Sequence, residues 1–438
     1  MTLFGTIRKK ILSKNIEKRN LEYLQVMEDK QRLFFQLGKF NKCWQKIIKN
    51  IQYYSDLVND KKLPKRFETW KEFLEKVPVI TKKTIQESKN IMFDKSRNID
   101  FVRTTGGTTS QPIQLPAWNS EMRITELDMW FARSWYGIYP NSKLFLIWGH
   151  SHLLGAGIKG KINKFKRKFK DYLLGYYRFS AYNMNEENMR RAALEMLDFH
   201  PDYIIGYSVV LDSFVRANRD LITELRKIGV KVVIGAAESF PSDNTEEILG
   251  KMFNCPVGME YGSVETNLIA HTHPDGGYKV FWQNYFVEAI DNGLQNGKII
   301  RVTSLYPRCF PLIRYEIGDA AQLFEGDNGI GLTRFQKVIG RCNLSVNLKD
   351  GSIIHSEVFT HALRDCEGII RYQVIQNKDS IRLLIIKNEK FNNNMEIRIK
   401  EKFSKIHPDL NKVKIEVVQN LEQTLAGKTP MIIRHTVD

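Results

Sequence analysis

The segment from residue 143 to residue 261 places the strongest constraint on the fold. It alternates short apolar, β-favouring runs with longer stretches of helical periodicity. The predicted strands are Lys143–Trp148, Asp202–Tyr207, Val230–Gly235 and Pro256–Tyr261, and the predicted helices are Asn185–His200, Leu211–Ile228 and Asn244–Phe253. Strands that are connected through helices in this way form a buried, mostly parallel sheet.

Two further regions follow this segment. Lys279–Asp291 and Lys298–Leu305 have the pattern of antiparallel strands joined by a turn, which predicts a separate β region. From residue 344 the pattern is that of a small αβ unit. Its predicted elements are Arg371–Gln376, Ile381–Lys387, Asn394–Ile406 and Val413–Val418.

The predicted fold class is therefore α/β, with a large multi-layer N-terminal domain of mostly parallel sheets plus a β region. A small mobile αβ domain follows it. We expect a basic helical segment over 1–66, the large domain over 67–343 and the small lid domain over 344–438.

The positive charge is concentrated in two stretches. The 438 residues carry 66 Lys and Arg against 49 Asp and Glu, a net charge of +17. Residues 1–66 hold 16 basic and 6 acidic side chains, and residues 159–170 hold 7 basic side chains and none that are acidic. Because the rest of the chain is balanced, we expect a local anionic surface as partner and no nucleic acid. Phe165 and Phe169 could stack on bases, but no recognised nucleic-acid module accompanies them.

The first twenty residues have the pattern of a basic amphipathic helix. Such a helix can lie on an anionic membrane, here through 1–20 and 159–170, or it can pack its apolar side onto its own domain. A mean hydropathy of −0.35 excludes a polytopic membrane protein. The N-terminus lacks a secretory pattern and the five cysteines are scattered, so we expect a cytoplasmic protein, peripheral at most at the inner face of the membrane.

A loop rich in Gly and Thr begins after Arg103. Glycine lets backbone amides approach a ligand closely, and the hydroxyl groups add donors, so such a loop can wrap phosphate oxygens. It is not a Walker loop, since no GKS or GKT follows, and a polar surface turn is the alternative. The candidate phosphate-binding residues are Thr104, Thr105, Gly106, Gly107, Thr108, Thr109 and Ser110.

Two carboxylates follow apolar runs later in the chain. In Met259–Thr266 an aromatic ring and a glycine end a predicted strand, and Glu265 could hold a divalent cation. In Phe310–Asp319 the final carboxylate could accept both hydrogen bonds of a ribose diol. The alternative for Glu265 is a solvated side chain on a turn.

Several further residues are weaker candidates for functional roles. A Gly-Arg pair ends at Arg341, and Lys428 follows a glycine near the C-terminus, where a solvated lysine is the alternative. Gly149–His152 could line a substrate pocket or be an ordinary polar loop. The spacing of Cys255, His271, His273 and Cys309 is no recognised zinc pattern, which leaves packed or surface side chains as the preferred interpretation.

The order of these motifs resembles that of the adenylate-forming (acyl-activating) enzyme superfamily, from roughly residue 70 to the end of the chain. Within that superfamily the sequence is most similar to the phenylacetate–CoA ligase branch and to its capsular-polysaccharide (CapK-like) members. The segments that carry this finer resemblance are Ser180–Glu187, Pro201–Tyr207 and the basic run Gly160–Lys170.

The resemblance implies a role for each motif. Thr104–Ser110, including the catalytic Thr108, would hold the β- and γ-phosphates of ATP, and Lys428 would bridge the carboxylate and the α-phosphate. Glu265 would bind Mg²⁺. Ala237 and Glu238 would line the adenine pocket, Tyr261 would stack on the base beside Gly262 and Ser263, and Asp319 with Arg341 would hold the ribose. A structural zinc near the cysteines and histidines is conceivable in this branch.

The implied reaction is ATP-dependent activation of a carboxylic acid, with CoA or an amine as acceptor. The acid could be an aryl, amino or sugar acid. Three positions depart from the family pattern: Ser110 where Gly is usual, Ile113 where Lys is frequent, and Asn343 where Asp or Lys is common at the hinge. They motivate an alternative, a catalytically degenerate nucleotide-binding or scaffold protein of the same fold. Glu265, Asp319 and Lys428 argue against it.

Overall fold

The computed structural model describes residues 3–25, 28–104, 113–148, 157–181, 186–237, 240, 244–291, 297–339, 345–350, 353–363, 366, 368–377, 380–422 and 431–435. Its α-helices are α1 (Leu3–Leu24), α2 (Asp29–Asn50), α3 (Gln52–Lys61), α4 (Trp70–Lys76), α5 (Lys82–Ser88), α6 (Asn119–Ser134), α7 (Gly157–Leu174), α8 (Glu186–Phe199), α9 (Ser208–Ala217), α10 (Ile222–Lys227), α11 (Thr245–Phe253), α12 (Ser356–Leu363) and α13 (Asn393–Ile406). Short 3₁₀ turns lie at Lys89–Ile91, Arg219–Leu221 and Pro408–Lys412.

The strands fall into three main sheets and two small hairpins. Their bounds are β1 (Phe101–Thr104), β2 (Gln114–Ala117), β3 (Leu144–Ile147), β4 (Tyr176–Phe179), β5 (Tyr203–Tyr207), β6 (Val232–Ala236), β7 (Val257–Ser263), β8 (Asn267–Thr272), β9 (Tyr278–Val280), β10 (Tyr285–Ile290), β11 (Lys298–Ser304), β12 (Tyr315–Gln322), β13 (Arg334–Phe335), β14 (Lys337–Ile339), β15 (Ser345–Asn347), β16 (Ile353–His355), β17 (Ile369–Gln376), β18 (Ile381–Lys387), β19 (Lys414–Val417) and β20 (Ile432–Arg434).

An eight-stranded sheet in the order β13-β9-β8-β7-β6-β5-β3-β4 forms the centre of the large domain. The pairs from β4 to β7 are parallel, and the pairs from β7 to β13 are antiparallel. Every residue of β3, β5 and β6 is buried, as expected for strands covered on both faces. The predicted α/β domain is confirmed, with parallel pairing limited to one half of this sheet.

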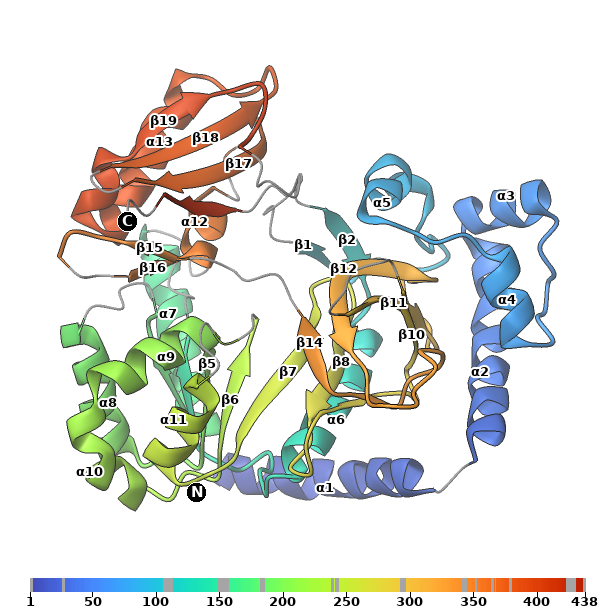
Figure 1. Ribbon diagram of the computed structural model, residues 1–438, viewed down its shortest axis with the longest axis horizontal. Coiled ribbons are helices and arrows are strands. Elements are labelled where there is room, and N and C mark those ends of the chain that lie inside the picture. The colour runs from blue at the N-terminus through green and yellow to red at the C-terminus, as the bar shows by residue number, and fades with distance from the viewer. Residues whose placement is uncertain are drawn as a thin grey trace.

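A four-stranded antiparallel sheet, β10-β11-β12-β14, forms the β region. Helices α2 to α4 lie along its outer side (Figure 1). The Trp70 ring stacks on Phe286 of β10 with centroids 3.6 Å apart, and Ile80 bridges to Tyr315 of β12. Segments more than 200 residues apart in sequence thus share one aromatic core.

The C-terminal residues form a separate αβ unit, coloured orange to red in Figure 1. Its sheet has the order β19-β18-β17-β20, and the β17–β18 hairpin is the one predicted from the sequence. Helices α12 and α13 pack on the sheet around a core that includes Phe359, Phe403 and Leu383. This core is distinct from the clusters of the large domain.

Two predicted elements differ from the structure. The predicted helix Leu211–Ile228 is interrupted because the buried Asn218 turns its amide back to the carbonyls of Met189 and Phe214, at 3.1 and 2.9 Å. The predicted strand Lys279–Asp291 is two strands, β9 and β10, which belong to different sheets. A tight turn divides them, in which the Tyr285 amide donates to the Phe281 carbonyl.

Helix α1 packs against α6. Ile16 is buried there, Arg8 pairs with Glu126 at 2.8 Å, and Arg19 pairs with Asp128 at 2.8 Å. Ile7 and Ile11 remain exposed, so one side of the helix faces solvent. No helix among the described residues has the length and apolar content needed to cross a bilayer.

Candidate functional site

The turn after β7 carries Glu265 in a fixed conformation. A Cβ on Gly262 would lie 2.0 Å from the carbonyl oxygen of Asn267, so only glycine fits this close approach. The Ser263 amide donates to Thr266 Oγ1 at 2.9 Å, and the Thr266 amide donates to Ser263 Oγ at 3.2 Å. These reciprocal bonds fix the turn and hold Glu265 at its apex.

Strand β12 contacts both strand β7 and the turn that follows it. The Tyr261 hydroxyl donates to Asp319 Oδ2 at 3.3 Å, and the Tyr315 hydroxyl donates to Glu265 Oε1 at 3.2 Å. Burial, together with Asp319, raises the pKa of Tyr261 well above its ordinary value. The tyrosine therefore stays protonated and remains a donor to Asp319. Candidates from two distant motifs are thus linked by hydrogen bonds.

Tyr261 itself lies inside the protein. The residue is 7% exposed, and its ring meets Tyr278 and Phe335 edge-on, with centroids 6.3 and 5.9 Å away. Its hydroxyl is the part directed at the site. Stacking of this ring on a base stays a prediction.

Other candidates lie at neighbouring strand ends. Ala237 follows β6, which is parallel to β7, and it is exposed with a φ of 72°, a conformation that is uncommon for a residue with a Cβ. Thr104 ends β1, at the root of the Gly/Thr loop. Ligands of open α/β sheets bind at the carboxyl ends of parallel strands. Thr105–Ser110, Glu238, Arg341, Asn343 and Lys428 lie outside the described residues.

One departure from the family pattern has a structural explanation. Ile113 is 1% exposed and belongs to the main core of the large domain. An apolar side chain at this position contributes to packing, and a lysine there would need a different environment.

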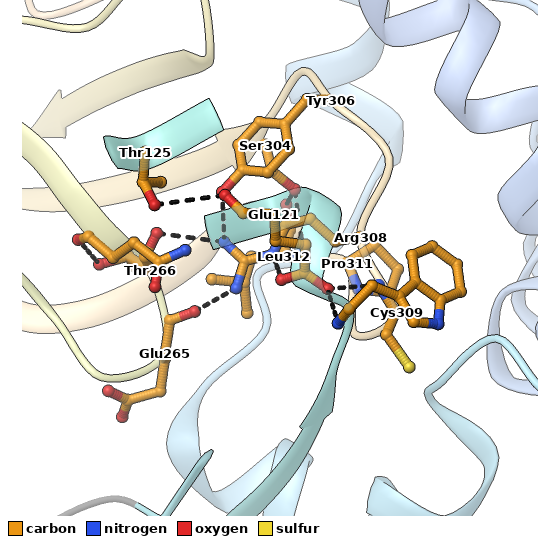
Figure 2. A network of polar contacts seen from close by, with 12 residues as sticks. Glu121, Thr125, Glu265, Thr266, Ser304, Tyr306, Arg308, Cys309, Pro311 and Leu312 are labelled. Atoms are coloured by element: carbon orange, nitrogen blue, oxygen red, sulfur yellow. Dashed lines mark hydrogen bonds and ion pairs between the residues drawn. The ribbon is translucent and has the colours of Figure 1, made fainter. Parts of the chain in front are cut away.

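Sequence reasoning missed a buried polar network beneath the turn, shown in Figure 2. Glu121, in the first turn of α6, accepts hydrogen bonds from the amides of Trp118 and Cys309 at 3.0 and 2.9 Å and from Arg103 Nη2 at 3.1 Å. Arg308 donates to the backbone carbonyls of Glu265 and Thr266, the latter at 3.1 Å. A glutamate at the third position of a helix was the one visible signal for Glu121.

A stacked aromatic pair at the strand ends was also missed. Trp148 follows β3 and Tyr207 ends β5, and their ring centroids are 3.9 Å apart with an interplanar angle of 29°. Parallel β3 and β5 are neighbours, so both rings lie at the carboxyl edge of the sheet. The sequence placed an aromatic residue at each predicted strand end but gave no reason to pair them. Gly149–His152 lies outside the described residues.

Two of the four zinc candidates, His271 and Cys309, are buried among other partners. His271 is buried, its Nδ1 donates to the Thr272 carbonyl at 2.8 Å, and burial lowers its pKa. Cys309 lies against the Asp94 carbonyl, and burial raises its pKa to about 12. Within the described part of the chain, no three His, Cys, Asp or Glu side chains are grouped closely enough to hold a metal.

Two sequence comparisons find similarity to CapK proteins. The family model of the CapK C-terminal domain matches residues 346–435. Protein CapK of Staphylococcus aureus is 25% identical over 448 residues, covering 99% of this chain and 96% of that protein.

Solved structures of a 2-hydroxyisobutyryl-CoA ligase match the fold. The ligase in its thioesterification state, with 2-HIB-AMP and CoA, matches with a TM-score of 0.61 at 17% identity, covering 93% of this chain and 90% of that one. Its open conformation, with the same ligands, matches with a TM-score of 0.57 at 16% identity, covering 93% and 92%.

Proposed function

We propose that this chain, a CapK-like protein with the fold of the adenylate-forming ligases, activates a carboxylic acid as an acyl-adenylate and releases pyrophosphate. CoA or an amine would then displace AMP, in the biosynthesis of a surface or capsular polysaccharide. The observation that carries the proposal is the meeting of the β7 turn with β12. There, hydrogen bonds join Tyr261 to Asp319 and Tyr315 to Glu265.

The nucleotide would lie across the carboxyl ends of β6 and β7. Asp319 would accept hydrogen bonds from the ribose hydroxyls, with its orientation fixed by the Tyr261 hydroxyl. Ala237 would lie beside the adenine. The loop over Thr104–Ser110 would donate to the β- and γ-phosphates, because its composition provides backbone amides and hydroxyls at close spacing.

The residues present fit a magnesium ion that is held mainly by its substrate. Glu265 is 8% exposed and receives one hydrogen bond from Tyr315, and no cluster of three ligand side chains exists among the described residues. Mg²⁺ is commonly bound through one or two carboxylates together with substrate phosphates and water. Glu265 would be that carboxylate, and the ion would supply charge neutralisation at the phosphates.

Lys428 would act at the reacting atoms. A carboxylate that attacks an α-phosphate brings two anions into contact, and a lysine placed between them stabilises the charge that develops. Because Lys428 belongs to the C-terminal part of the chain, closure of that part over the large domain would assemble the site.

The test is ATP–pyrophosphate exchange with a panel of aryl, amino and sugar acids. We expect exchange with one class of acid, and a loss of roughly 10²–10³-fold in Lys428→Ala. Lys412→Ala is the matched control, since Lys412 is an exposed lysine of the same αβ unit, paired with Asp409. It should exchange at the wild-type rate.

The remaining outcomes separate the alternatives. ATP binding by calorimetry without exchange for any acid would favour the degenerate nucleotide-binding or scaffold protein. Absence of ATP binding would overturn the adenylation proposal altogether. If exchange occurs, mass spectrometry of the product formed with CoA and with amines identifies the acceptor.

We also propose that the protein works at an anionic membrane surface, through α7 together with α1. Four large apolar residues of α7 are exposed and recur every three or four residues, which places them on one face: Ile162, Phe165, Phe169 and Tyr172. Lysines and one arginine lie between them. Each basic side chain near an anionic leaflet contributes about 1 kcal/mol, and the apolar face adds burial in the interface.

Flotation with vesicles tests this. We expect binding to vesicles containing phosphatidylglycerol, weaker binding at high salt, and none to neutral phosphatidylcholine vesicles. The double substitution Phe165→Ala with Phe169→Ala should abolish binding. Leu194→Ala on α8, which removes another exposed apolar side chain away from α7, should not. Failure of the wild-type protein to float with anionic vesicles at low salt would overturn this proposal.

A further inference from the structure

A single buried carboxylate connects the two parts of the nucleotide site. Glu121 is 1% exposed, and its two oxygens accept hydrogen bonds from three donors on three segments. One of these donors, Arg103, precedes Thr104 at the end of β1, where the Gly/Thr loop begins. Glu121 therefore anchors the root of that loop.

Arg308 connects the same carboxylate to the Glu265 turn. Its Nε lies 3.6 Å from Glu121 Oε2, and its Nη atoms donate to the carbonyls of Glu265 and Thr266 and to the Tyr306 hydroxyl (Figure 2). The Thr266 carbonyl also accepts from the Tyr285 hydroxyl. Arg308 thus holds the backbone carbonyl of Glu265, and the Glu265 carboxylate points away from Arg308 (Figure 2).

The network contains two arginines, and Glu121 supplies one negative charge against their two positive charges. Arg103 and Arg308 are 8% and 4% exposed and share the one carboxylate of Glu121. Burial and the neighbouring Arg308 lower the pKa of Arg103. Burying charges is costly, and apolar residues of similar volume often give equal or greater stability. The network is better explained by the geometry that it imposes.

We propose that Arg308 and Glu121 are positioning residues for Mg·ATP. Through Arg103 they fix the start of the phosphate loop, and through the Glu265 carbonyl they fix the turn that carries the metal carboxylate. The start of the phosphate loop and the Glu265 turn thereby keep a fixed position relative to each other. This inference rests on the proposed adenylation activity. Neither residue touches the reacting atoms.

The test compares Arg308→Met and Arg308→Lys with the wild-type protein. Lysine keeps the charge but loses the guanidinium fork that reaches two carbonyls at once. In Arg308→Met we expect the Mg²⁺ concentration for half-maximal exchange to rise roughly 10–100-fold, as is typical when a group that orients a metal ligand is removed. The KM for the carboxylic acid should not change. Arg308→Lys should give a smaller rise, and Glu121→Gln should resemble it.

Arg32→Met is the matched control. Arg32 is 7% exposed, donates to the Gly331 carbonyl at 2.6 Å and pairs with Asp29, so it resembles Arg308 in burial and bonding but lies at a distant turn. It should lose stability and keep its Mg²⁺ requirement. An unchanged Mg²⁺ requirement in both Arg308 variants, or an equal change in Arg32→Met, would overturn the inference.

Calorimetry of ATP binding at several Mg²⁺ concentrations separates this inference from the proposed function. If the wild-type protein binds Mg·ATP but exchanges with no acid, the adenylation proposal fails. The Mg²⁺ dependence of ATP binding in Arg308→Lys then still decides the positioning role. If the wild-type protein does not bind ATP, both proposals are overturned.

Discussion

Two residues of one motif, Asp319 and Arg314, have different roles. In Phe310–Asp319 the carboxylate of Asp319 faces the candidate site, whereas Arg314 points into the interior. Arg314 donates to the carbonyls of Leu74 and Val77, at 2.7 and 2.6 Å, and pairs with Glu288 at 2.9 Å. Arg314 therefore fastens α4 to the antiparallel sheet.

Replacement of this arginine should destabilise the fold. Arg314→Met leaves Glu288, which is 0% exposed, as an unpaired buried charge, so we expect a loss of about 3–5 kcal/mol in the free energy of unfolding. Denaturant titration measures it. The double variant Arg314→Met with Glu288→Leu should recover part of the loss, because it removes the orphaned carboxylate. Equal losses in the single and double variants would contradict this explanation.

Alanine substitutions at Gly262 and Gly38 provide a test and its control. Gly262→Ala places a methyl group against the Asn267 carbonyl, so the turn must shift and move Glu265. We expect exchange activity to fall by roughly 10²-fold, since small misplacements of site groups have effects of that size. Gly38 lies in α2 with nothing within 4 Å of an added Cβ. Gly38→Ala should leave activity intact and add about 0.5–1 kcal/mol of stability, measured by thermal unfolding.

At the level of elements, α1 is held on α6 through a buried carboxylate whose pKa is raised. Asp128 is fully buried, pairs with Arg19 and accepts a hydrogen bond from the Asn284 amide. Burial raises the pKa of Asp128 from 3.8 to about 6, although Arg19 lowers it. The folded protein therefore keeps this proton at a pH where the unfolded chain has released it.

The sign of the pH effect follows from this difference. Because the folded state binds the proton more tightly, this group makes folding less favourable as pH rises from about 4 to about 6, by roughly 2 kcal/mol over that interval. Asp128→Asn lacks the titrating carboxyl group. Between pH 4 and pH 6 its free energy of unfolding should therefore lack this decrease, which the wild-type protein should show. Asp29→Asn, at an aspartate whose side chain is 85% exposed, is the control and should not alter the difference. The same slope in all three proteins would contradict the assignment.

The elements that sequence could predict are those defined by local pattern. Buried strands such as Tyr203–Tyr207 are short apolar runs between helical segments, and they appear within a residue or two of their predicted bounds. The division of Lys279–Asp291 into β9 and β10 could not be predicted, because both halves favour strands and only tertiary pairing assigns them to different sheets. Arg308 was missed because its partners are backbone carbonyls, which leave no sequence signal.

At the scale of the whole molecule, the C-terminal αβ unit has its own core. Phe359, Phe403 and Ile432 are fully buried within one cluster that contains no residue of the large domain. A unit with its own core can fold alone. The boundary at residue 344 stays a prediction that a fragment can test.

A fragment spanning 344–438 should fold by itself. We expect a cooperative thermal transition followed by circular dichroism, and dispersed amide signals in its NMR spectrum. Phe403→Ala should lower its stability by about 3–5 kcal/mol, because it opens a cavity in the core. Ile397→Ala, at an exposed apolar residue of the same helix, is the control and should have little effect. A fragment without a cooperative transition would place the boundary elsewhere.

The aromatic core that joins the two ends of the large domain has a consequence for biosynthesis. Trp70 stacks on Phe286, and the Tyr54 hydroxyl donates to the Pro311 carbonyl, so α3 and α4 acquire all of their final neighbours only after residue 311 has been translated. At ordinary ribosomal speeds of about 5–20 residues per second, that interval is roughly 10–50 s. During it, the nascent chain exposes aromatic side chains that the folded protein buries, so we expect this region to depend on chaperones during synthesis.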